Sequence, residues 1–170
     1  MIYNAKSIDR KSFLIENEAN ETISQIAYEK WYSIKAEIIT PKSKYIIKPK
    51  NILETSIYVL EEDNLKFIFK MNFRREILIK DMVNNKKYKL KSRGIKNIKL
   101  YLVDSNNNVL AGIHPEFIQK NFTFNYTMKV NEKFEALPNN ELFIPLLFHC
   151  CNYIIDIYIL LLSKNTNEKY

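Results

Sequence analysis

The sequence predicts a mainly β protein, a closed antiparallel barrel of about 10–12 strands around a C-terminal hydrophobic helix. Hydrophobic and polar residues alternate in short runs over most of the chain, and turn-forming residues separate these runs at intervals of roughly 8–12 residues. The last apolar run is longer and does not alternate. With 170 residues, of which 46% are hydrophobic and 26% charged, the chain is predicted to form a single domain over residues 1–170.

The alternation extends from about Ser12 to about Leu137 and is clearest over residues 66–73. One face of that strand would carry Phe67, Phe69, Met71 and Phe73. Runs of similar character are predicted as further strands around residues 13–16, 22–40, 45–48, 56–60, 77–82, 87–93, 98–104, 109–113 and 122–128. His114-Pro115-Glu116 reads as a turn, because proline restricts the residue before it. No helical segments alternate with the strands, which argues against a parallel α/β fold.

The terminal segment Leu142–Leu162 predicts one helix over about residues 142–163. It contains no lysine, arginine or glycine, and acidic Glu141 precedes it while basic Lys164 follows it. Its 21 residues are enough to span a bilayer, so a C-terminal membrane anchor is one interpretation.

The other interpretation is a core helix, because a helix that is apolar nearly all round is either a membrane span or the centre of a protein. His149, Asn152 and Asp156 fall on one helical face, and an aspartate costs about 2.5–3.5 kcal/mol at the centre of a membrane span. Inside a barrel this polar stripe would need partners from the wall, such as tyrosine hydroxyls, threonines or lysines. We favour the core helix.

The chain combines early aromatic residues at Tyr28, Trp31 and Tyr32 with strand-like runs over residues 67–77 and 97–108 and the very hydrophobic terminal segment Leu142–Leu162. This order of about ten to twelve short aromatic-rich strands and a terminal helix resembles the tubby C-terminal-domain-like superfamily. That group includes tubby proteins, phospholipid scramblases and LURP-one-related proteins. The resemblance covers about Ser12 to Lys164, and asparagine stands where turn glycines are usual in that group. It implies a closed barrel around the helix and, from tubby domains, phosphoinositide binding.

The charge pattern is the main functional signal. The net charge is +7, yet residues 66–99 alone contain twelve basic and two acidic residues. A strand over residues 87–93 would direct alternate lysines from one face, and such a cluster attracts phosphate groups. The alternative is a solvated face that protects edge strands from aggregation. The candidate residues for an anionic ligand or lipid are Lys70, Arg74, Arg75, Lys87, Lys89, Lys91 and Arg93.

These features predict a non-enzymatic binding module that docks on anionic phospholipid headgroups, at a membrane surface, or on a partner protein. A membrane-anchored β-domain and a nucleic-acid-binding barrel are the alternatives. The second would stack bases on aromatic residues, but no RNP-type or zinc-finger pattern supports it. We expect a monomer. The first ten residues hold no apolar signal-peptide core, so we expect a cytoplasmic protein, peripheral at the inner membrane surface.

Chemistry-bearing motifs give no positive signal. The sequence has no GxSxG, P-loop or HExxH pattern, and we predict no catalytic residue, no cofactor and no metal site. The neighbouring His149, Cys150 and Cys151 are the one candidate for a hydrolase or metal enzyme. Adjacent helical residues project about 100° apart, and a thiol in an apolar helix is normally inert.

Overall fold

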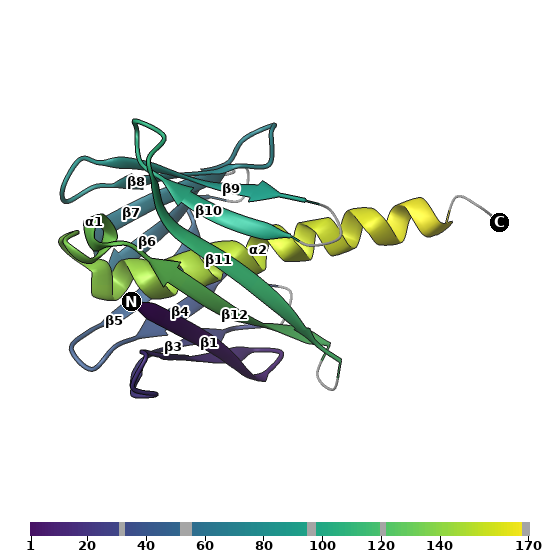
Figure 1. Cartoon of the computed structure of the whole chain (residues 1–170), viewed down its shortest axis with the longest axis horizontal. Coiled ribbons are helices and arrows are strands. Elements are labelled where there is room, and N and C mark those ends of the chain that lie inside the picture. The colour runs from purple at the N-terminus through teal and green to yellow at the C-terminus, as the bar shows by residue number, and fades with distance from the viewer. Residues whose placement is uncertain (31–32, 52–55, 95–97, 120–121, 168–170) are drawn as a thin grey trace.

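The barrel is seen in a computed structural model, which describes residues 1–30, 33–51, 56–94, 98–119 and 122–167, with side chains as far as Ile157. In this part of the chain twelve antiparallel strands close into a barrel, and one long helix, α2, runs through it (Figure 1). The strands are β1 (Ile2–Asp9), β2 (Ser12–Glu16), β3 (Thr22–Tyr28), β4 (Ala36–Ile39), β5 (Lys44–Pro49), β6 (Ser56–Glu61), β7 (Asn64–Met71), β8 (Ile77–Asp81), β9 (Lys87–Arg93), β10 (Lys99–Val103), β11 (Val109–Ile118) and β12 (Thr123–Val130). The helices are α1 (Glu132–Glu135) and α2 (Asn140–Asn167).

Each strand pairs with its neighbours in sequence, and β12 returns to pair with β1, with Ile2 opposite Lys129 and Ala5 opposite Tyr126. The predicted barrel around a C-terminal helix is therefore confirmed. The sheet begins earlier than the predicted start near Ser12, because β1 precedes it. That strand was missed because only two of its residues, Tyr3 and Ala5, are buried.

The turn predicted at His114-Pro115-Glu116 is wrong, because these residues lie within β11 and pair with β12. Proline removes one ladder hydrogen bond and is normally confined to edges. Here β10 pairs with β11 only as far as Ile113, so Pro115 lies beyond the region where β11 has strand partners on both sides.

The helix α2 forms the centre of the core. Every residue from Leu142 to Cys151 is buried, and so are Ile154 and Ile155, as expected for a helix that strands surround on all sides. The strands supply alternate inward side chains, such as Phe67 and Phe69 on β7. The core-helix interpretation is thus confirmed for Leu142–Ile155. Within the described residues, no helix combines the length and the apolar character needed to cross a bilayer.

One end of the barrel is closed by an aromatic cluster centred on Phe143 of α2. The Phe143 ring centroid lies 4.9 Å from that of Tyr88 and 5.2 Å from that of Phe67. The fully buried Phe134 of the short helix α1 stacks on it at 5.7 Å. The side chain of Asn131 caps α1 by accepting the backbone N–H of Phe134. We call this end of the barrel the closed end.

Three hairpins share one five-residue turn, at residues 17–21, 72–76 and 104–108. In each, the side-chain oxygen of the first residue accepts the backbone N–H groups of the third and fifth residues. The fourth residue has a positive φ, namely 59° at Asn20, 60° at Arg75 and 63° at Asn107. Asparagine tolerates this left-handed conformation, which explains how the barrel turns its corners with only two glycines in the chain.

The connections of the barrel alternate between its two ends. Those between β2 and β3, β4 and β5, β6 and β7, β8 and β9, and β10 and β11 lie at the closed end. The other six lie at the end where α2 leaves the barrel toward the C-terminus (Figure 1). We call this second end the helix-exit end.

Candidate anionic-ligand surface

The strand β9 carries the predicted lysines as expected. Tyr88 and Leu90 are buried, whereas Lys87 and Lys89 are exposed on the outside of the barrel and Lys91 is half-buried there. The two-residue period of a strand produces this arrangement, because the aromatic and aliphatic residues between the lysines face α2. The outward direction predicted for the three lysines is confirmed.

The strand register brings further cations beside them. Lys80 lies directly opposite Lys87, and Lys70 and Lys89 flank Leu78 across three adjacent strands. Arg93 lies opposite Lys99. We call this outer surface of β7–β10 the basic wall; it consists of Lys70, Lys80, Lys87, Lys89, Lys91, Arg93 and Lys99.

Like charges directly opposite one another destabilise a sheet, and neighbouring acids do not relieve them here. Within the described residues, no carboxylate forms an ion pair with a member of the basic wall. The two acids of residues 66–99 are used in turns instead. Asp81 is buried and accepts the backbone N–H groups of Val83 and Asn84, while Glu76 accepts the side-chain amide of Asn72. Among the described residues, the positive charge of the wall therefore has no carboxylate partner.

Two nearby lysines differ in their partners. Lys66 lies next to this region but forms an ion pair with Glu61 at 2.7 Å, so it does not belong to the wall. Lys91 donates a hydrogen bond to the side-chain oxygen of Asn107 at 3.0 Å, which holds its ammonium group beside the turn at residues 104–108. Within the wall, Lys70, Lys87, Lys89, Arg93 and Lys99 are exposed, whereas Lys80 and Lys91 are half-buried.

The structure divides the seven predicted residues between two places. Lys70, Lys87, Lys89, Lys91 and Arg93 lie on the basic wall. The two remaining residues, Arg74 and Arg75, lie in the turn between β7 and β8 at the helix-exit end. Their closeness to Lys70 in sequence does not place them on the wall, because the chain reverses at residues 72–76.

This turn also exposes an aromatic residue that the sequence pattern placed inside. Phe73 was predicted to share the buried face of Phe67 and Phe69, but β7 ends at Met71 and Phe73 is 89% exposed. The guanidinium carbon of Arg74 lies 5.4 Å from the centre of the Phe73 ring. One sequence signal could have revealed this turn: Asn-Phe-Arg-Arg-Glu at residues 72–76 matches the turn sequence Asn-Glu-Ala-Asn-Glu at residues 17–21 in its first and last residues.

A second arginine–phenylalanine pair lies at the same end of the barrel. The guanidinium carbon of Arg10, in the connection between β1 and β2, is 5.7 Å from the centre of the Phe122 ring. Phe122 lies between β11 and β12, is 68% exposed and has a φ of 50°. Since β12 pairs with β1, these two connections are neighbours on the rim.

The two ends of the barrel carry opposite charge. Of the described residues in the connections at the helix-exit end, seven are basic (Arg10, Lys11, Lys30, Lys35, Lys50, Arg74, Arg75) and two acidic (Glu29, Glu76). At the closed end, five are acidic (Glu18, Glu21, Glu62, Asp63, Asp104) and two basic (Lys42, Lys86). An anionic surface would therefore be attracted to the helix-exit end and repelled from the closed end.

The polar stripe of α2 finds some of the partners that burial requires, although the Nε2 atom of His149 is buried without a hydrogen-bond partner among the described residues. The Nδ1 atom of His149 shares a hydrogen bond of 3.1 Å with the hydroxyl of Tyr28, and the Tyr126 hydroxyl donates to Asn152 at 2.9 Å. Partners from tyrosine hydroxyls on the wall were predicted, and this is confirmed. Burial lowers the pKa of His149 to about 3 and raises those of both tyrosines, so these groups are neutral near pH 7.

The two thiols of α2 are also held in their neutral form. Cys150 and Cys151 are fully buried, and burial raises the pKa of each thiol above its ordinary value. A thiolate, rather than a thiol, is the nucleophile and the metal ligand. Among the described residues, no group of three or more histidines, cysteines or carboxylates is placed to hold a metal ion.

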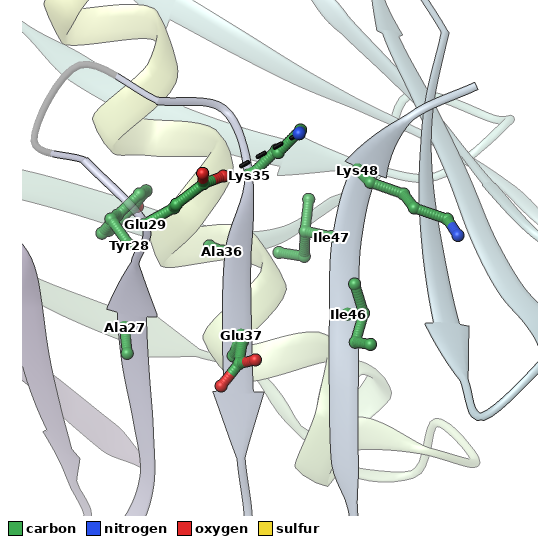
Figure 2. Close-up of a pocket in the computed structure, with 9 residues that line it drawn as sticks. All are labelled: Ala27, Tyr28, Glu29, Lys35, Ala36, Glu37, Ile46, Ile47 and Lys48. Carbon is green, nitrogen blue, oxygen red and sulfur yellow. Dashed lines mark ion pairs between the residues drawn. The ribbon is translucent and has the colours of Figure 1, made fainter. Parts of the chain in front are cut away.

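A groove of about 420 Å³ crosses β3, β4 and β5 (Figure 2). Small residues, Ala27 and Ala36, leave the space, and Ile46 supplies an apolar side. The charges around it are mixed: Glu29 pairs with Lys35 at 3.8 Å across its end, and Glu37 also contributes a carboxylate. This groove lacks the uncompensated positive charge of the basic wall.

Comparisons with known proteins found no match to this chain, whether among protein-family models, curated proteins or solved structures. The resemblance to the tubby-like superfamily stays a prediction. Of the residues that suggested it, Trp31, Tyr32 and Asn97 lie outside the described residues, whereas Tyr28 faces the core and contacts His149.

Proposed function

We propose that this protein is a non-enzymatic binding module that docks on the headgroups of an anionic phospholipid bilayer. The observation that carries the proposal is the uncompensated basic wall on β7–β10. A folded surface gains nothing from placing Lys80 opposite Lys87, and a layer of phosphates would supply the missing counter-charge.

Phospholipid fits this surface better than the alternatives. The wall is broad and convex, and Phe67, Phe69 and Tyr88 face the core; only Tyr101, half-buried opposite Lys91, lies on the outer face among the aromatic residues described in β7–β10, and one ring is a poor stacking platform for a run of bases. A membrane surface presents many phosphates at once. Each lysine or arginine near such a surface contributes about 1 kcal/mol, which makes seven wall cations a substantial attraction even after screening.

The test is charge reversal on β9 with Lys87→Glu, Lys89→Glu and Lys91→Glu in one chain. Binding to vesicles of phosphatidylcholine and phosphatidylserine should fall by about a hundredfold or more at low salt. The fold should survive, because these side chains point outward and Lys87→Glu places an acid opposite Lys80. Sedimentation with vesicles and thermal unfolding measure the two effects.

A matched control reverses Lys6, Lys42 and Lys44, which changes the net charge equally elsewhere on the barrel, on β1, on β5 and in the connection before β5. These lysines already pair with Glu16, Glu141 and Glu37. The control should retain most of the binding. Equal losses in both variants would show that net charge, rather than the basic wall, determines attraction. Binding that survives reversal of the β9 lysines would contradict the role of the wall.

A further inference from the structure

We propose that the helix-exit end of the barrel is the part that enters the bilayer surface, with Phe73 and Phe122 inserted among the headgroups and Arg74 and Arg10 on the phosphates. This inference rests on the proposed function and adds an orientation to it. The barrel would stand tilted, with α2 directed at the membrane and with the part of the basic wall nearest the helix-exit end, Lys70, Lys91, Arg93 and Lys99, leaning onto the phosphates.

The first support comes from a comparison of the three turns that share one backbone geometry. Residues 17–21, 72–76 and 104–108 have the same side-chain hydrogen bonds and the same positive φ at the fourth position. At that position Asn20 and Asn107 are well suited, but Arg75 is not. The turn geometry therefore does not require the exposed aromatic ring of Phe73 or the guanidinium of Arg74 over it.

The second support comes from another connection. Phe122 combines high exposure with a φ of 50°, a conformation that bulky residues rarely adopt. The guanidinium of Arg10 lies over one face of its ring, as that of Arg74 lies over the Phe73 ring, and both rings stay largely exposed. Neither ring contributes to the core. Such a pair suits the boundary between phosphates and acyl chains, because the ring can enter the apolar layer while the guanidinium grips a phosphate.

The two pairs lie apart on the rim. Phe122 sits between β11 and β12, and Phe73 sits between β7 and β8, so β8 to β11 separate them along the barrel wall. Two separated anchors on one rim fit an extended flat partner such as a bilayer, whereas a small ligand would touch only one. The seven basic residues described in these connections give the rim the complementary charge.

The path of α2 agrees with this orientation. The last buried residue described in α2 is Ile155, and the helix continues to Asn167 on the same side of the barrel (Figure 1). Twelve further residues extend a helix by about 18 Å. In the sequence, residues 157–162 are all hydrophobic. The acidic closed end faces away from the membrane in this arrangement.

The test compares substitutions at the two ends of the barrel, each made in the full-length chain. At the helix-exit end, Phe73→Ser and Phe122→Asn remove both rings, and asparagine accepts the positive φ. The control, Val83→Ser with Val109→Ser, removes two residues of the closed end that are 56% and 52% exposed. Binding is measured by sedimentation with vesicles of phosphatidylcholine and phosphatidylserine, and thermal unfolding checks the fold.

The expected result is binding weaker by about tenfold or more for the helix-exit variant and within about twofold of the wild type for the control. If the helix-exit variant binds like the wild type while reversal of the β9 lysines removes binding, the orientation is wrong and the proposed function stands. If the wild type does not bind anionic vesicles at all, the proposed function fails and the orientation fails with it. Equal weakening of both variants would indicate unspecific adhesion and overturn the orientation.

Discussion

The two ends of the barrel close the same sheet but use different residues. At the closed end, Phe143 and Phe134 bury their rings against the strands, and the connections are acidic and polar. At the helix-exit end, Phe73 and Phe122 leave their rings in solvent beneath arginines. The same residue type thus fills the core at one end and covers the surface at the other.

This difference separates the residues that folding requires from those that it does not. The turn at residues 17–21 shows that an acidic and small tip closes a hairpin with the same hydrogen bonds as the turn at residues 72–76. The aromatic and basic character of the second tip therefore needs another explanation than the fold, and an anionic surface supplies one.

The largest expected effect contrasts one phenylalanine at each end. Phe143→Ala should lower the free energy of unfolding by about 3–5 kcal/mol, because it leaves a cavity among Tyr88, Phe67 and Phe134. Phe73→Ala should change it by less than about 0.5 kcal/mol, because that ring is exposed. Urea unfolding followed by circular dichroism measures both. A large loss from Phe73→Ala would mean that its ring supports the fold.

Replacement of the buried His149 should have an effect of intermediate size on the free energy of unfolding, and this effect depends on pH. Burial lowers the pKa of His149 to about 3, while the unfolded chain takes up a proton near pH 6.5. Its contribution to stability is therefore complete above pH 6.5 and is lost as the pH falls toward 3, by about 1.4 kcal/mol per pH unit. His149→Gln should remove this slope, and the exposed His114→Gln should not.

This test needs the difference between the curves of unfolding free energy against pH for the wild type and His149→Gln. The reason is that Asp156 changes the stability with pH in the opposite direction. Although Asp156 is exposed, partial desolvation of its carboxyl raises its pKa to about 6, so its contribution to stability is present at low pH and is lost as the pH rises through that value. Subtracting the wild-type curve from that of His149→Gln isolates the histidine. Parallel curves for these two chains would show that His149 is not buried in its neutral form.

The smallest effect concerns the turns. Arg75→Asn should raise the free energy of unfolding by about 0.5–1 kcal/mol, because asparagine adopts the positive φ of 60° more readily than arginine. The reverse exchange, Asn20→Arg in the turn at residues 17–21, should lower it by a similar amount. Chemical unfolding of both variants is sufficient. If Arg75→Asn is destabilising, then Arg75 contributes to the fold, and one support for the orientation is lost.

The sequence predicted the architecture well, because two signals were unambiguous. Alternation such as that of Tyr88 and Leu90 with the β9 lysines specifies a strand with one buried face, and the non-alternating Leu142–Leu162 specifies a helix. The polar stripe of that helix also predicted hydrogen-bond partners among the tyrosines of the barrel strands. The strand β1 was missed because only two of its residues are buried, and its outward face mixes Ile2 and Ile8 with Asn4 and Lys6.

The candidate site was predicted only in part, because it depends on where the chain turns. The two-residue period of a strand predicts the outward direction of the β9 lysines. Arg74 and Arg75 lie only a few residues from Lys70 in the sequence, but they lie in the turn at the helix-exit end rather than on the basic wall. Alternation continued past Met71 in the sequence and hid the turn that exposes Phe73. Phe122 and Arg10 are far apart in the chain, and only closure of the barrel between β12 and β1 brings them together.

The most direct test of the account is the binding of the wild-type protein to two kinds of vesicle at two salt concentrations. Vesicles of phosphatidylcholine with phosphatidylserine should bind it at low salt and release it as salt rises, because charges separated by more than about 8 Å are screened at physiological ionic strength. Vesicles of phosphatidylcholine alone should bind it far more weakly. Binding that is equal on both vesicles and insensitive to salt, or no binding to either, would contradict the account.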